Sequence, residues 1–402
     1  MKQSFAIICL LNILLLSATA QHKTEADALD KFKKEQEQGA QQDEQAFRQY
    51  KAEVTKQFND YAAEQERLFK EYARQIEKKW GQKNVVTSSK KEYVSYNSNY
   101  TSRNSINFEE GRAKTEVLVT EVEAKNPSLI EQKLKEQVAQ LVVAKGGTDP
   151  LEVKNGIPPE EKPILSEQIL ANDGKPVTEN SAKQFAEQTV QPAEVSQEVV
   201  TGKDGIKRVV VGIQIPLVPN HVKKRATDFR ELVKKESGRF GIDITLVFAI
   251  MHTESYFNPK AKSPVPAFGL MQLVPKSGAR DAFFFAHNKD SLVTGEYLYV
   301  PDNNIELGTA YLTKLLTVDF RGVKDSHSKI YCAISAYNTG PGNVAKAFTG
   351  KRNVTQALPQ INAMTSDQVF EHLKKNLPFE ETRSYVAKVS ERMGLYNEWS
   401  KE

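Results

Sequence analysis

The sequence predicts a multidomain protein: a mainly α-helical domain at the C-terminal end, preceded by a small α+β domain and an amphipathic helical extension. Three observations predict this architecture. The chain has 402 residues, which is more than one domain usually holds. The apolar residues recur at helical spacing to about residue 80, alternate in short runs between 85 and 219, and return to helical spacing from 220 onward. A region rich in Pro, Gly and charged residues at 148–180 separates periodic segments.

The composition is that of a globular protein with nearly balanced charge. Hydrophobic residues make up 39% of the chain, which suffices for a real core. There are 55 basic and 51 acidic residues, for a net charge of +4. A nucleic-acid-binding protein concentrates Lys and Arg on one face. We therefore expect no nucleic-acid partner.

The first twenty residues predict a signal peptide. Lys2 supplies a positive charge, and Phe5–Leu16 is almost wholly apolar. Ala18 and Ala20 then place small residues at the −3 and −1 positions of a cleavage site, so that Gln21 begins the mature chain. The apolar run is shorter than the ~18–20 residues of a membrane-spanning helix, which makes a retained anchor the lesser alternative. We expect export.

The cysteines predict neither a disulfide nor a metal site. Cys9 lies within the signal segment and is expected to leave with it, so that Cys332 is the one cysteine of the mature chain. The six His residues are scattered, and the sequence has no H-E-x-x-H or C-x-x-C spacing. We expect no metal and no cofactor.

The segment 21–84 predicts a charged amphipathic helical extension. It contains no Pro between residues 25 and 80, and Gly39 is expected to interrupt the helix. Two interpretations stay open: an arm that binds a protein partner or self-associates, or a helix that docks on its own chain. The apolar stripe comprises Phe47, Tyr50, Val54, Phe58, Tyr61, Leu68, Tyr72 and Ile76.

The segment 85–219 predicts the small α+β domain. Short alternating runs indicate strands near 93–96, 106–108, 115–121 and 209–215. Apolar residues at helical spacing indicate one helix over 129–142, which Gly146 and Gly147 stop. No pattern in this region indicates catalytic chemistry.

The segment 220–402 predicts a mainly α-helical domain. A stripe from Phe229 to Phe240 indicates a helix that Gly241 ends. The further helices are expected at 244–255, 304–316, 329–337, 343–348, 366–374 and 381–392.

Glu254 is the candidate acid. It shares a helix face with Val247 and Met251 at the end of an apolar helix. A carboxyl in such a place loses hydration, which raises its pKa. A carboxyl that is protonated near neutral pH suits the protonation of a glycosidic oxygen. Taken alone, however, this pattern also fits a solvated surface glutamate.

Four short motifs follow one another in the last domain: Glu254-Ser255, Gly269–Gln272, Ala336–Val344 and Glu381–Val386. Their order and spacing resemble the soluble lytic transglycosylase family, which has a lysozyme-like fold shared with goose-type lysozymes. The resemblance implies that residues 220–402 form a lysozyme-like catalytic domain and that peptidoglycan glycan strands are its partner and substrate.

The resemblance also assigns roles. Glu254 would act as general acid and then as general base at the bond between N-acetylmuramic acid and N-acetylglucosamine, forming a 1,6-anhydro ring with one carboxyl. The residues implied to contact substrate are Ser255, Met271, Gln272, Tyr337, Asn338 and Tyr385.

Trp80-Gly81, Tyr93-Val94 and Ser105–Phe108, and later Val218–His221 and Lys224–Ala226, extend the match upstream. On these residues the chain from about 75 to 395 resembles the membrane-bound lytic murein transglycosylase C family, most clearly after Val218. Its 85–219 segment would match that family's accessory domain. Two departures stand out. The family carries a lipid-bearing cysteine directly after its signal sequence, whereas none stands near Ala20 here, and the extension is an addition. No lipid anchor is evident, so we expect a periplasmic, envelope-located protein and leave peripheral association with the outer membrane open.

Two rival functions stay open. A lysozyme-type hydrolase on the same fold would need a second carboxyl. A non-catalytic peptidoglycan-binding scaffold would need none. The available carboxyl groups after the second motif are those of Asp281, Asp290, Glu296 and Asp302.

Overall fold

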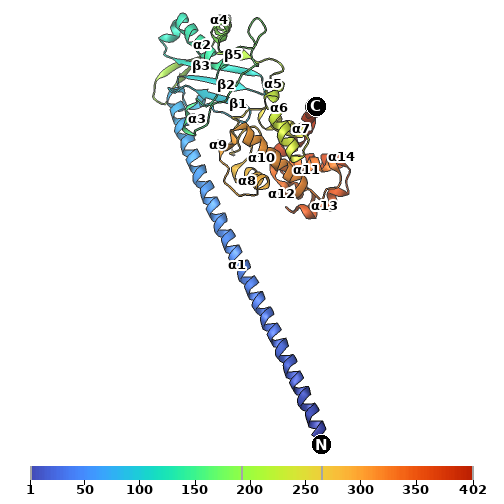
Figure 1. Cartoon of the computed structure of the whole chain (residues 1–402). Helices are drawn as coiled ribbons and strands as arrows, with labels where there is room; N and C mark the ends of the chain where they lie inside the picture. The colour runs from blue at the N-terminus through green and yellow to red at the C-terminus, as the bar shows by residue number, and fades with distance from the viewer. Residues whose placement is uncertain (1, 192, 264–265, 401–402) are drawn as a thin grey trace. The chain divides into compact units, whose positions relative to one another are not determined.

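The computed structural model describes residues 2–191, 193–263 and 266–400 (Figure 1). The chain divides into two units, Met1–Ala63 and Glu64–Glu402. The backbone of residues 2–30 is described but their side chains are not, so nothing in the structure tests the predicted signal peptide.

One long helix, α1 (Lys2–Trp80), runs through both the signal segment and the extension (Figure 1). The expected interruption at Gly39 is wrong, because α1 is continuous there. A single glycine costs a helix only about 1 kcal/mol, and the surrounding Gln, Glu, Lys and Ala residues favour the helix. Pairs four residues apart, such as Arg48 with Glu44 at 2.6 Å, add to it.

The end of α1 packs against the α+β domain. Tyr72, Ile76 and Trp80 are buried in one cluster with side chains of the sheet, including Val94 and Tyr96. The last turns of the extension therefore share a core with the sheet. For this part of the helix, the structure agrees with docking on its own chain.

The described strands form one antiparallel sheet in the order β1-β2-β3-β5-β4. The predicted strands correspond to the first three and to β5. Strand β4 was not predicted, because it is a polar edge strand with only Val200 buried. The strands are β1 (Glu92–Tyr96), β2 (Ser102–Asn107), β3 (Arg112–Val119), β4 (Ser196–Thr201) and β5 (Lys207–Pro216).

Two helices, α2 (Pro127–Val142) and α4 (Ala182–Val190), pack against each other and share the core of this sheet. Leu134 and Val138 of α2 are fully buried in a cluster with Phe108 and Val211. The expected loop region also holds a short helix, α3 (Pro150–Lys154). Single-turn helices precede the sheet and α2: η1 (Gln82–Asn84) and η2 (Glu123–Lys125).

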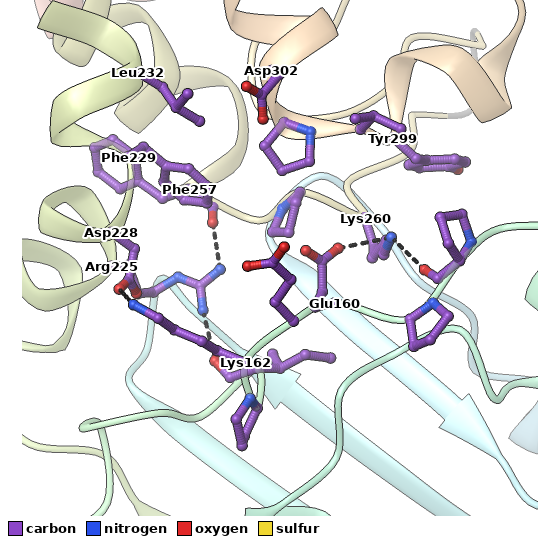
Figure 2. Close-up of a pocket in the computed structure, with 18 residues that line it drawn as sticks. Glu160, Lys162, Arg225, Asp228, Phe229, Leu232, Phe257, Lys260, Tyr299 and Asp302 are labelled. Atoms are coloured by element: carbon purple, nitrogen blue, oxygen red, sulfur yellow. Dashed lines mark hydrogen bonds and ion pairs between the residues drawn. The ribbon is translucent and has the colours of Figure 1, made fainter.

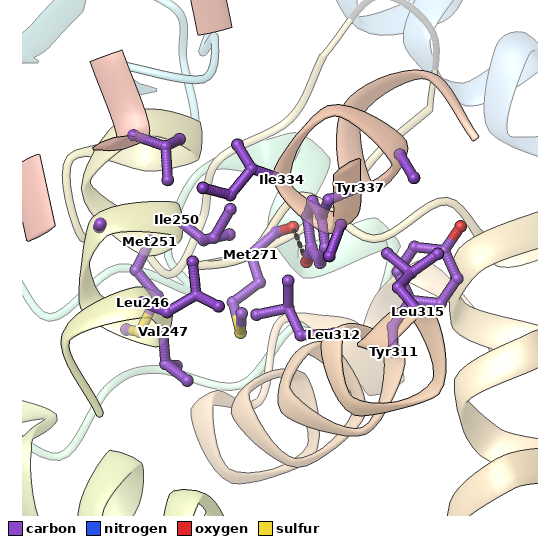
Figure 3. Packing of buried hydrophobic residues seen from close by; sticks show 14 of the residues in the cluster. Leu246, Val247, Ile250, Met251, Met271, Tyr311, Leu312, Leu315, Ile334 and Tyr337 are labelled. Atoms are coloured by element: carbon purple, nitrogen blue, oxygen red, sulfur yellow. Dashed lines mark hydrogen bonds between the residues drawn. The ribbon is translucent and has the colours of Figure 1, made fainter. Parts of the chain in front are cut away.

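The remainder of the chain is a helical domain around one core (Figure 3). The centre of the domain is α7 (Ile244–Ser255), which begins and ends where the sequence predicts. Helices α8, α9 and α13 were not predicted. The other elements are α5 (His221–Asp228), α6 (Arg230–Phe240), η3 (Pro275–Ala279), α8 (Arg280–His287), α9 (Gly295–Leu298), α10 (Pro301–Lys314), η4 (Leu315–Asp319), α11 (Ser326–Thr339), α12 (Pro341–Thr349), α13 (Val354–Asn362), α14 (Ser366–Asn376), α15 (Glu380–Met393) and η5 (Gly394–Ser400).

Candidate active site

Helix α7 carries Glu254 in its last turn. The Asp243 side chain caps the start of the helix by accepting a hydrogen bond from the Thr245 amide. The helix ends at Ser255, and the next residue, Tyr256, has a left-handed backbone with φ of 50° that turns the chain away. Since α7 is buried along most of its length, Glu254 is only 5% exposed.

The two carboxylate oxygens of Glu254 face different partners. The Tyr385 hydroxyl of α15 donates a 2.8 Å hydrogen bond to Oε1. The Lys90 ammonium group lies 3.7 Å from Oε2 and 3.4 Å from the exposed carboxylate of Glu381. One neutral donor and one cation thus flank the buried acid.

Burial raises the pKa of Glu254 to about 7. Lys90 and the Tyr385 hydrogen bond favour the charged form and oppose this rise, whereas the negative charge of Glu381 adds to it. At neutral pH the group is therefore a mixture of acid and carboxylate. The burial and the raised pKa are those that the sequence predicts.

Ser255 braces the loop of the second motif. Its hydroxyl is fully buried, 3.1 Å from the Met251 carbonyl oxygen and 2.7 Å from that of Leu270. The side chain thereby ties the end of α7 to the Gly269–Gln272 segment.

Met271 lies in the hydrophobic core beside Leu312 and Val247 (Figure 3). Its amide donates a 2.8 Å hydrogen bond to Oδ1 of Asn304, and its carbonyl accepts one of 2.8 Å from the Tyr337 hydroxyl. The backbone of Met271 is thus fixed on both sides while its thioether fills the core.

Gln272 adopts a left-handed backbone with φ of 49°. Its Nε2 atom donates to the carbonyl oxygens of Ala261 and Gly269 at 3.1 and 3.0 Å. Its Oε1 atom is buried and has no hydrogen-bond partner within the described residues. The amide therefore has one acceptor to offer a ligand.

Asn338 and Tyr337 follow each other at the end of α11. The Asn338 Oδ1 atom accepts a 2.6 Å hydrogen bond from the Thr382 hydroxyl, while the Tyr337 hydroxyl is occupied by Met271. Of the predicted site residues, only Tyr385 has a hydrogen bond to Glu254 recorded in the described part of the chain.

Three residues around this site were missed: Lys90, Asn304 and Thr382. Asn304 is fully buried, and its amide group binds the carbonyl oxygens of Phe268 and Leu298. A polar residue within an apolar helical stripe is a signal that could have indicated it. No sequence signal points to Lys90, because it reaches Glu254 from a different domain.

Two of the acids considered for a hydrolase pair with basic side chains. Asp290 pairs with Arg280 at 2.5 Å, and Asp281 lies 3.5 Å from Lys314. Asp302 lines a cavity of about 420 Å³ between α5, α10 and the Pro158–Pro163 loop (Figure 2). Glu254 is not among its lining residues.

Within the described residues, no group of three or more His, Cys, Asp and Glu side chains is arranged to hold a metal ion. In the same described part of the chain, no helix is both long enough and apolar enough to cross a membrane.

Two family models match different parts of the chain. Residues 231–358 match the transglycosylase SLT domain, and residues 41–228 match the N-terminal domain of membrane-bound lytic murein transglycosylase C. The transglycosylase C of Edwardsiella ictaluri is 34% identical over 327 residues, covering 80% of this chain and 86% of the relative. The chain belongs to the membrane-bound lytic murein transglycosylase C family. The relative from Sodalis glossinidius is 36% identical over 321 residues, covering 78% of this chain and 85% of that one.

The transglycosylase C family member described here is also similar to solved structures of soluble transglycosylases. The 70 kDa soluble lytic transglycosylase of Escherichia coli is 29% identical, with a TM-score of 0.33 over 42% of this chain and 24% of that one. A complex of the 70 kDa enzyme with bulgecin A gives 27% identity and a TM-score of 0.35 over 45% and 26%. The matched part spans about a quarter of those longer chains.

Proposed function

We propose that this protein is an exported lytic murein transglycosylase that cleaves the bond between N-acetylmuramic acid and N-acetylglucosamine, with Glu254 as its acid and base. Membership of the transglycosylase C family supports the activity. The observation that supports the role of Glu254 is its burial against one hydroxyl and one ammonium group, with a pKa of about 7.

In the first step, protonated Glu254 donates its proton to the glycosidic oxygen, and the bond from that oxygen to C1 of the muramyl residue breaks. Positive charge develops at the sugar ring as the acid becomes a carboxylate. Tyr385 and Lys90 are placed to stabilise that carboxylate.

In the second step, the Glu254 carboxylate removes the proton of the muramyl 6-hydroxyl, whose oxygen bonds to C1 and closes the 1,6-anhydro ring. No water is consumed, and Glu254 regains its proton. One carboxyl therefore serves both steps, whereas hydrolysing glycosidases use a pair.

We assign substrate contact to the polar groups of the site that can still accept or donate a hydrogen bond. The Oε1 atom of Gln272 would accept a hydrogen bond from an acetamido or hydroxyl group of the sugar, and Asn338 would donate from its amide. Ser255, Met271 and Tyr337 would act on the site through the loop that they hold, because their polar side-chain and backbone groups are already occupied.

The test is digestion of purified peptidoglycan sacculi with the chain from Gln21 onward, with mass spectrometry of the released muropeptides. We expect products ending in 1,6-anhydromuramic acid, lost in Glu254→Gln and retained in Glu391→Gln, which neutralises an exposed glutamate of α15. Reducing ends, one water heavier, would instead establish a hydrolase. Glycan strands bound but not cut would establish the scaffold.

The family name and the predicted signal peptide support an envelope location. For the extension we propose contact with a protein partner or a second copy through the aromatic stripe around Tyr50, which is 39% exposed. Sedimentation of the mature chain over a concentration series would reveal self-association, and a concentration-independent monomer would rule it out.

A further inference from the structure

Lys90 reaches the candidate acid from outside the helical domain. It lies between η1 and β1 of the α+β domain, and its side chain is one-third exposed. Its ammonium group is 3.7 Å from Oε2 of Glu254 and 3.4 Å from Oε1 of Glu381. The cation thus stands between a buried carboxyl and an exposed one.

We propose that Lys90 is a positioning residue for Glu254: its charge orients the Oε2 atom and sets the pH range over which the acid is protonated. This inference rests on the proposed role of Glu254 as acid and base. It makes the α+β domain a part of the catalytic machinery, although the sequence of that domain indicates no chemistry.

The other groups that act on Glu254 come from two helices. Glu381 and Tyr385 lie on α15, and Tyr337 lies on α11. Burial raises the pKa of both tyrosines well above the ordinary value, so both stay neutral at any working pH. Lys90 is therefore the cation, and Glu381 the anion, whose charges act on Glu254 in the described part of the chain.

The backbone next to Lys90 is held against the helical domain. Its neighbour Lys91 pairs with Glu109 at 2.7 Å, and Glu109 accepts a 2.9 Å hydrogen bond from the Tyr256 hydroxyl. Arg392 of α15 donates to the same hydroxyl at 2.7 Å. These contacts join the segment that carries Lys90 to the end of α7 and to α15. The backbone at Lys90 is therefore held in place relative to the helical domain.

The position of Lys90 suits both steps of the proposed reaction. Proton donation leaves a negative charge on Glu254 in a buried place, where an unpaired carboxylate is costly. A cation near Oε2 stabilises that charge. Because Lys90 does not occupy Oε1 and lies beyond ordinary hydrogen-bond distance from Oε2, the acid keeps an oxygen from which to donate its proton.

The test is the pH dependence of kcat/KM for release of anhydro-muropeptides, whose alkaline limb reports loss of the proton from the acid of the free enzyme. Removing the cation in Lys90→Gln destabilises the carboxylate, so the limb moves to higher pH. An opposite charge within about 4–6 Å lowers a carboxyl pKa by roughly one to three units. Because Lys90 is partly exposed and its charge is screened, we expect the limb to move by about one pH unit. Well above the limb, the variant would then retain about tenfold more of its plateau activity than the wild type.

Three further variants sharpen the test. Lys90→Arg keeps the charge and should keep the limb in place. Lys83→Gln removes an equal charge from an exposed site in the same segment and should also leave the limb in place. Glu381→Gln removes the opposing charge and should move the limb to lower pH, by less than the Lys90 effect because that carboxylate is 71% exposed.

A limb for Lys90→Gln that coincides with that of Lys83→Gln would overturn the proposal, as would loss of activity at every pH without a shift. Thermal unfolding of each variant separates a folding defect from a shifted limb. If Glu254→Gln still cuts sacculi, the proposed function of Glu254 has failed whatever Lys90 does. If Glu254→Gln is inactive and the limb of Lys90→Gln is unmoved, only the inference about Lys90 fails.

Discussion

The hydrogen bond from Tyr385 to Glu254 offers the most direct test of how the site sets the pKa of Glu254. In Tyr385→Phe the ring is kept and one oxygen atom is removed. Because Tyr385 is only 5% exposed and buried among core residues, the phenyl ring should occupy the same space. What changes is the 2.8 Å bond to Oε1 of Glu254.

The size of the effect follows from the charge of the acceptor. A hydrogen bond to a charged group contributes about 1.5–3 kcal/mol, and one to a neutral group about 0.5–1.5 kcal/mol. The bond therefore favours the carboxylate over the acid by about 1–1.5 kcal/mol, and one pKa unit corresponds to about 1.4 kcal/mol. Its loss should raise the pKa of Glu254 from about 7 by roughly one unit.

The assay is the initial rate of anhydro-muropeptide release as a function of pH. The alkaline limb of Tyr385→Phe should move upward, while Tyr331→Phe, a change at a half-buried tyrosine of α11, should match the wild type. An unmoved limb would mean that the hydrogen bond does not discriminate between the two forms of Glu254. A limb that moves to lower pH would contradict the assignment of the Tyr385 hydroxyl as donor.

Three further predictions concern stability. Because the folded-state pKa of Glu254 is raised from 4.5 to about 7, the native chain loses stability as the pH rises through this window, so Glu254→Gln should be the more stable chain at pH 8 by up to about 3 kcal/mol, with the gain absent near pH 4 in urea unfolding. Arg225→Met should cost about 3–5 kcal/mol by urea unfolding, because it leaves the buried carbonyl oxygens of Ile164, Tyr256 and Phe257 without this donor, at about 1–3 kcal/mol each; a loss below about 1 kcal/mol would refute this. Gly308→Ala should lower the melting temperature by an amount equivalent to about 1–3 kcal/mol, because the added methyl group meets the Met271 side chain; unchanged melting would show that this side chain can move aside.

Much of the fold could be predicted because the spacing of apolar residues indicates helices and strands even when the tertiary contacts are unknown. Helix α7 has an unbroken apolar run from Leu246 to Met251 and begins after an aspartate cap, and both of its ends were predicted. Strand β4 could not be predicted in this way, because its residues are mainly polar and its order depends on pairing with β5. The opposite error concerns α1, where a break was expected at Gly39 but the helix continues. A single glycine destabilises a helix only weakly, and the helix-favouring residues around Gly39 outweigh it.

The residues of the site could be predicted from the sequence better than the contacts that these residues make. The burial of Glu254 follows from the helix that carries it. The direction of the Gln272 side chain does not, because it depends on a left-handed backbone that only the folded loop sets. Lys90 has no local signal at all, since its role arises from the packing of one domain on another.

The contacts give the four sequence motifs a shared physical purpose. Ser255 of the first motif binds the Leu270 carbonyl of the second, and Tyr337 of the third binds the Met271 carbonyl. Tyr385 of the fourth returns to Glu254 of the first. Three of the motifs thus place a side chain against another motif, and the second accepts through its backbone carbonyl groups, which fixes the acid relative to the loop and to α15. A change at any of these positions should therefore act on the geometry of one carboxyl, even where the altered side chain touches no sugar.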